Sequence, residues 1–198
     1  MKKIIIYLRY LPILIFYPLF KNNVRLIMDV NRWQKGNESL NGKIANLLFS
    51  YREFRNLFIY RNNTHIIFSR WIKLWYPPEK TLYIVSPDIG GGFYIQHGFA
   101  TYISAEKIGE NCWVNQQVTI GFKDDSGKSP VIGDNVTVSC GAKVLGNIIL
   151  GNKMVIGANA VVTKSFPQGN CIIAGVPAKE IRRYQSHPEN KKVENLND

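Results

Sequence analysis

The sequence predicts a mainly β protein, in which a parallel β-helix follows an N-terminal α-helical part. The main observation is a repeat: between residues 108 and 166, aliphatic residues recur every six positions, with one gap at position 126. A fixed short period indicates a repeat architecture, whose units are stabilised by the neighbouring units on which they stack. The aliphatic residues in this frame are Ile108, Val114, Ile120, Ile132, Val138, Val144, Leu150, Ile156 and Val162.

The second observation is the turn chemistry between these aliphatic residues. Gly and Asn recur there, as in residues 133–135, 146–147, 151–152 and 157–159. Both tolerate the left-handed backbone of a sharp corner. Six residues suit one short strand and a turn, so three such strands would close one triangular coil. A β-sandwich is the alternative, but its strands would alternate with a period of two and vary in spacing.

The β-helix is expected to begin near Leu82. Ile89, Ile95 and Tyr102 are predicted to point inward in a first, less regular coil. Residues 122–130 replace one turn by a polar loop, and loops on a rigid scaffold commonly carry substrate contacts. The period stops at Pro167, after which residues 171–178 are expected to fold over the end of the stack and cover its open edge.

Residues 1–80 form the predicted helical part, residues 81–180 the β-helix, and residues 181–198 a polar tail that we expect to be disordered. The clearest helix is predicted at residues 39–61, with Ser39 or Asn37 as its cap. A second helix is predicted at residues 64–75 and ends before Pro77. The predicted core-facing residues of the first helix are Leu40, Ile44, Leu47, Tyr51, Phe54 and Phe58, and those of the second are Ile67, Trp71 and Trp75.

The positive charge is concentrated in the helical part. Residues 1–80 hold 14 Lys and Arg against 4 Asp and Glu, whereas residues 81–198 hold 11 against 10. Such asymmetry suggests an anionic surface as a partner. The apolar run at residues 4–20 is short and contains two prolines, so we do not expect it to span a membrane. Two predictions stay open: a helix packed on its own protein, or a peripheral anchor at the inner face of the membrane of a cytoplasmic protein.

The three cysteines, Cys112, Cys140 and Cys171, are an odd number without ligand-like spacing. We interpret them as free thiols in a reducing compartment, and we predict no metal site. We expect no nucleic-acid partner.

The repeat and several shorter motifs resemble hexapeptide-repeat acetyltransferases, in particular serine O-acetyltransferases and the sugar O-acetyltransferases of polysaccharide clusters. The resemblance covers nearly half of the chain. It implies a left-handed β-helix, a homotrimer, and acetyl-CoA as co-substrate. The motifs are Ile95–Thr101 (IQHGFAT), Val118–Gly121 (VTIG), Gly141–Asn147 (GAKVLGN), Ile156–Val162 (IGANAVV) and Ala174–Ala178 (AGVPA).

His97 is the predicted catalytic residue. It is the only histidine within the repeat scaffold, and Gly98 beside it permits close approach. An imidazole with an ordinary pKa near neutrality suits removal of a proton from an attacking hydroxyl. The alternative is a histidine held by a backbone carbonyl. The resemblance matches His97 to the catalytic histidine of the family.

The acceptor side departs from the serine enzymes. The resemblance implies Asp before the catalytic histidine, a second histidine in the polar loop, and a partner Asp fifteen residues before the catalytic one. This chain has Gln96, Ser129 and Leu82 at those positions. We therefore expect Gln96, Lys128 and Ser129 to meet an acceptor other than serine, with Asp29 as a weaker candidate.

The donor side matches better. The resemblance implies that the pantetheine arm of acetyl-CoA lies in a groove between neighbouring subunits, against small-residue corners. A backbone N–H, such as that of Gly121, is expected to stabilise the oxyanion. Lys164 and Lys179 are expected to meet the CoA phosphates. The expected groove residues are Gly121, Cys140, Gly141, Ala142, Ala158, Asn159 and Ala160.

These observations favour an acetyl-CoA-dependent O-acetyltransferase that acts on a sugar hydroxyl of a surface polysaccharide or its precursor. Serine O-acetyltransferase of cysteine synthesis is the enzyme alternative. A non-catalytic β-helix scaffold is the third hypothesis, although such a protein would be expected to lose His97 and the small corners.

Overall fold

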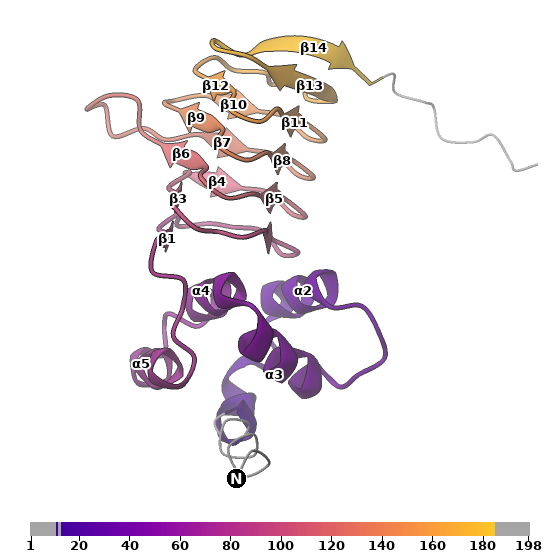
Figure 1. Ribbon diagram of the computed structural model, residues 1–198, viewed down its shortest axis with the longest axis vertical. Coiled ribbons are helices and arrows are strands. Elements are labelled where there is room, and N and C mark those ends of the chain that lie inside the picture. The colour runs from indigo at the N-terminus through magenta and orange to yellow at the C-terminus, as the bar shows by residue number, and fades with distance from the viewer. Residues whose placement is uncertain (1–10, 12, 185–198) are drawn as a thin grey trace, which may run out of the picture.

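The computed structural model describes residues 11 and 13–184. The chain folds as a column of β-coils that stands on a layer of helices (Figure 1). Residues 13–20 are helical. The further helices are α2 (Val24–Trp33), α3 (Leu40–Ser50), α4 (Arg52–Arg61) and α5 (Ile66–Trp75).

The column has three faces, each a sheet of short strands. The first sheet has the order β1-β3-β6-β9-β12, the second β10-β7-β4, and the third β14-β13-β11-β8-β5-β2. All pairings are parallel except that of β13 with β14. The strands are β1 (Leu82–Ile84), β2 (Tyr94–Ile95), β3 (Thr101–Ile103), β4 (Lys107–Ile108), β5 (Trp113–Val114), β6 (Thr119–Gly121), β7 (Val131–Ile132), β8 (Thr137–Val138), β9 (Lys143–Leu145), β10 (Ile149–Leu150), β11 (Val155–Ile156), β12 (Val161–Val162), β13 (Cys171–Ala174) and β14 (Lys179–Arg183).

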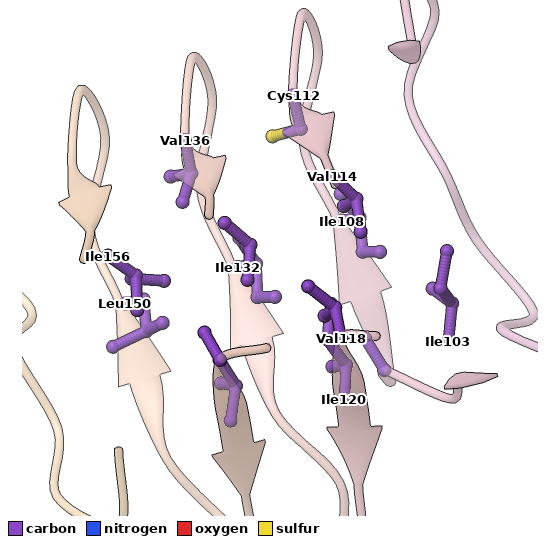
Figure 2. Close-up of a cluster of buried hydrophobic side chains, with 14 of the residues drawn as sticks. Ile103, Ile108, Cys112, Val114, Val118, Ile120, Ile132, Val136, Leu150 and Ile156 are labelled. Atoms are coloured by element: carbon purple, nitrogen blue, oxygen red, sulfur yellow. The ribbon is translucent and has the colours of Figure 1, made fainter. Parts of the chain in front are cut away.

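The repeat frame is confirmed by burial. All nine predicted aliphatic residues are at most 2% exposed. Figure 2 shows several of them, with Cys112, Val118 and Val136 between them, pointing into the interior of the column. One aliphatic per strand stacks on its equivalents in the coils above and below, so the core is continuous along the axis.

The end of the column is covered much as predicted. After β13 the chain crosses the outer edge of β12, where Val161 N donates to Gly175 O and Ala178 N donates to Val161 O. It then returns as β14 along the outer edge of β13. Strand β14 extends to Arg183, beyond the predicted end of the β-helix at residue 180.

Three predictions about inward-facing residues are wrong. Tyr51 is 44% exposed, because it lies between the two helices that replace the single predicted one. Tyr102 is 43% exposed, and Ile103 occupies the inward position because it pairs with Ile120. Ile67 is 83% exposed, whereas Phe68 and Ile72 of the same helix are buried. Tyr102 has an aliphatic neighbour in Ile103, and Ile67 has an aromatic neighbour in Phe68. Apolar character alone therefore did not predict which of the two residues faces the core.

The predicted helix at residues 39–61 is two helices. Tyr51 has an extended backbone and serves as both the C-cap of α3 and the N-cap of α4. Ser39 caps α3 as predicted, since its Oγ accepts a hydrogen bond from Gly42 N. The break turns α4 across the N-terminal end of the column, where Leu57 joins the β-helix core.

The basic helical part has its own aromatic core, formed mainly by Phe20, Phe54, Phe58 and Phe68. Ile13 and Phe20 of the first helical segment are fully buried in it. One face of the described end of the apolar run therefore packs on its own protein, whereas Leu14, Ile15 and Leu19 are 47%, 55% and 44% exposed. Residues 4–10 and 12 lie outside the described residues. Among the residues that the structure describes, no helix is long and apolar enough to cross a membrane.

Candidate active site

His97 lies on an unusually long corner of the column. The corner joins β2 to β3, and five residues lie between the inward-facing Ile95 and Thr101, whereas three lie between Val114 and Val118 in the next coil. His97 itself has a positive φ of 65° and an exposed side chain. The two extra residues make this corner protrude, so the imidazole is presented to solvent on a rigid scaffold.

Equivalent corners of the following coils stack directly on that of His97. Gln117 N donates to Phe99 O at 3.0 Å, Gly141 N to Gln116 O at 3.0 Å, and Asn159 N to Cys140 O at 2.9 Å. We call this column of corners the His97 edge; it comprises residues 96–100, 115–117, 139–141 and 157–159. The predicted groove residues Cys140, Gly141, Ala158 and Asn159 therefore share one edge with His97.

Small residues on this edge permit close stacking. Gly141 has a φ of 71°, and a Cβ at this position would collide with Oδ1 of Asn159. Lys179 also lies here, because it follows the turn that crosses β12. Ala142 and Ala160, in contrast, are fully buried in the column. The inward position after each corner requires a small side chain for the core, and their contact with acetyl-CoA stays a prediction.

Gly121, Lys128, Ser129 and Lys164 lie at a different edge. Strand β6 runs from Thr119, at the His97 edge, to Gly121 at its other end, where the polar loop begins. An open groove of about 620 Å³ lies at this second edge, which we call the Gly121 edge. Its lining includes Ser104, Phe122, Lys128, Ser129 and Asn147. Within one chain, these predicted site residues do not meet His97.

Asp29 does not contact an acceptor, and that prediction is wrong. Its carboxylate is fully buried, forms an ion pair with Arg61 (Nε to Oδ2, 2.7 Å), and accepts a hydrogen bond from Phe93 N at 2.7 Å. Burial raises the pKa of Asp29, and the ion pair with Arg61 opposes this shift. Arg61 also donates to the carbonyls of Ile89 and Gly90. This cluster fastens the helices to the first coil.

Gln96 lies next to His97 and is half-buried, whereas Leu82 is a core residue with 4% exposure. Position 82, where the resemblance implies an acid, thus presents no charge. A carboxylate that the sequence did not reveal lies nearby: Glu53 of α4 packs against Gly98. Its only sequence signal was a lone acid in the first turn of a helix.

The thiols are free, and two are buried. Burial raises the pKa of Cys112 to about 11, which keeps it in the unreactive thiol form. Among the residues that the structure describes, no three His, Cys, Asp or Glu side chains gather as metal ligands would.

The geometry defines a class of protein: a left-handed parallel β-helix of hexapeptide repeats with an exposed histidine at one edge. In sequence, the chain is similar to known serine acetyltransferases. The enzyme from Synechococcus elongatus is 39% identical over 98 residues, which is 48% of this chain and 40% of that protein. The enzyme from Staphylococcus aureus strain Mu50 is 39% identical over 98 residues, which is 48% of this chain and 46% of that protein.

Solved structures extend the likeness to the helical part. The serine O-acetyltransferase of Brucella melitensis aligns with a TM-score of 0.62 and 22% identity, over 87% of this chain and 71% of that one. Isoform 3 of serine acetyltransferase from Entamoeba histolytica, in complex with cysteine, aligns with a TM-score of 0.56 and 26% identity, over 93% of this chain and 65% of that one. No protein-family model matches the sequence.

The predicted fold and the predicted resemblance to serine O-acetyltransferases are confirmed by these likenesses. The chain spans less than half the length of the curated relatives that it matches.

Proposed function

We propose that this chain is an acetyl-CoA-dependent O-acetyltransferase with His97 as its general base. The observation that carries the proposal is the His97 edge. It combines an exposed imidazole on a protruding corner with small, stacked corners at Cys140–Gly141 and Ala158–Asn159, on a β-helix shared with serine acetyltransferases. The use of acetyl-CoA supports the predicted cytoplasmic location.

The chemistry is a direct transfer in a ternary complex. The acceptor oxygen forms a bond to the thioester carbonyl carbon as the His97 imidazole removes the hydroxyl proton. The C–S bond then breaks, and the proton passes from the imidazole to the departing CoA sulfur. A positioned base of this kind contributes about 10²–10⁴ in rate.

A second copy of the chain completes the site in this proposal. Gly121, Lys128 and Ser129 lie at the far end of the strands from His97, so they reach an acetyl-CoA at the His97 edge only from a neighbouring subunit. A closed trimer places the Gly121 edge of one copy against the His97 edge of the next. Sedimentation velocity should give three times the mass of the chain; a monomer with full activity would contradict this arrangement.

Serine is the acceptor that the comparisons favour over a sugar, because the reported relatives are named serine acetyltransferases. Polysaccharide acetylation has no such support. A sugar hydroxyl is kept as a second candidate on one observation: Gln96, Leu82 and Ser129 stand where the resemblance to the serine enzymes implies Asp, Asp and His.

The test is a free-thiol assay with acetyl-CoA and a panel of acceptors. For serine as the physiological acceptor we expect kcat/KM near or above about 10⁴ M⁻¹s⁻¹. A serine value a hundredfold or more below that of a hexose or nucleotide sugar would establish the sugar candidate. Absence of thiol release above hydrolysis with all acceptors would contradict the proposed function and favour the scaffold hypothesis.

A further inference from the structure

Glu53 of α4 lies against Gly98, the residue that follows His97. A Cβ added to Gly98 would lie 3.0 Å from Cβ of Glu53 and 3.0 Å from Cδ2 of Leu82. Glu53 from the helical part and Leu82 from the first coil therefore converge on the residue that follows His97. The Glu53 side chain therefore begins beside the backbone of the corner that carries His97.

This approach is fixed by the architecture of α4. Asn56, one turn after Glu53, donates to the carbonyls of Glu79 and Leu82 at 3.0 Å and accepts from Glu79 N at 2.8 Å. Leu57 packs in the β-helix core with Leu82. Figure 1 shows α4 lying against the end of the column beside β1. The first turn of α4, which carries Glu53, is thereby held under the long corner of His97.

Glu53 is half-buried, and among the described residues none donates a hydrogen bond to its carboxylate. Among the described residues, the imidazole of His97 likewise neither donates nor accepts a hydrogen bond. The phenol of Tyr94 is close enough to Glu53 for the two groups to interact electrostatically. Burial raises the pKa of Tyr94, and the neighbouring Tyr51 and Glu53 raise it further. A half-buried carboxylate without a structural partner, beside an imidazole without one, is suited to orient that imidazole.

We propose that Glu53 is the positioning carboxylate of His97, in place of the acid that the resemblance implies at position 82. The structure does not contain a hydrogen bond between Glu53 and His97. In the complex with acetyl-CoA and acceptor, the Glu53 carboxylate accepts this bond from one ring nitrogen, which fixes the ring orientation and leaves the other nitrogen free to take the acceptor proton. The inference rests on the proposed function. It makes α4 of the helical part a component of the active site.

The test compares Glu53→Gln, Glu53→Asp and His97→Asn in the trimeric full chain, with acetyl-CoA and the best acceptor of the panel. We expect Glu53→Gln to lower kcat about 10- to 100-fold, less than His97→Asn, because the base itself stays in place. KM for acetyl-CoA should change less than about twofold, since Glu53 does not touch the donor groove. Glu53→Asp should recover part of the loss.

Glu38→Gln is the matched control, because it removes the same charge from the helical part, where Glu38 is bonded to Gln34 and Asn46. It should keep wild-type kcat. Equal kcat for Glu53→Gln and wild type, beside an inactive His97→Asn, would overturn the role of Glu53 and leave the proposed function standing. An inactive wild type would overturn both. A kcat loss in Glu53→Gln that Glu53→Asp does not relieve, with a matching loss of thermal stability, would also contradict the positioning role.

Discussion

The β-helix and the helical part of this molecule differ in how far along the chain their core contacts reach. In the β-helix, each inward residue packs on residues one coil away, and the same pattern repeats from coil to coil. In the helical part, Phe20, Phe58 and Phe68 meet from three separate helical segments. A repeated local rule can be extracted from a sequence, whereas a single non-repeating assembly of aromatic rings cannot.

The junction between the two regions should show the largest single effect. In Arg61→Met, the carboxylate of Asp29 stays buried without its cation, so we expect about 3–5 kcal/mol of lost stability. Arg25→Met is the control, since the Arg25–Asp88 pair is exposed and its loss should cost about 0–1 kcal/mol. Urea unfolding measures both. Similar losses in the two variants would mean that the cluster at Asp29 does not join the regions.

The face that α5 presents to the aromatic core is tested by two matched isoleucines. Ile72 is 1% exposed and Ile67 is 83% exposed. Ile72→Ala should lower the free energy of unfolding by about 2–5 kcal/mol, because it leaves a cavity in the helical core. Ile67→Ala should change it by less than about 0.5 kcal/mol. The reverse order of these effects would restore the face that the sequence pattern predicted.

Within the β-helix, the stacked corners give a smaller but specific effect. Gly141→Ala combines the strain of a positive φ with a collision against Asn159, so we expect a loss of about 1–3 kcal/mol. Gly127→Ala provides the control: its φ is +69°, yet nothing lies within 4 Å of an added Cβ. The amount by which Gly141→Ala loses more unfolding free energy than Gly127→Ala measures the close stacking at the His97 edge. Equal losses would indicate that the stacking there is loose.

The sequence predicted the column well because its period is enforced in every coil. It failed at Tyr102, where the two extra residues of the His97 corner shift the frame, and these residues carry no signal other than a broken period. It missed the break at Tyr51, since the apolar spacing of the helical pattern continues across it. Local patterns do not encode a change of direction that tertiary packing imposes.

The candidate site was predictable in part. His97 and the corners at Cys140–Gly141 and Ala158–Asn159 follow from the repeat and the resemblance. Asp29 was misassigned because a lone acid in a sequence does not reveal a buried partner such as Arg61. Glu53 was missed because its proximity to Gly98 depends on how α4 packs on the first coil. Contacts between the two regions are the part of the site that only the structure provides.

The central claim is that His97 is the base of an acetyl transfer, and one measurement tests it most directly. Free-thiol release from acetyl-CoA is followed for wild type and His97→Asn at matched protein concentration, with CoA affinity determined on the same samples. We expect His97→Asn to bind CoA as wild type does and to lose about 10²–10⁴ in kcat. A His97→Asn variant that keeps more than a tenth of the wild-type kcat would contradict the account.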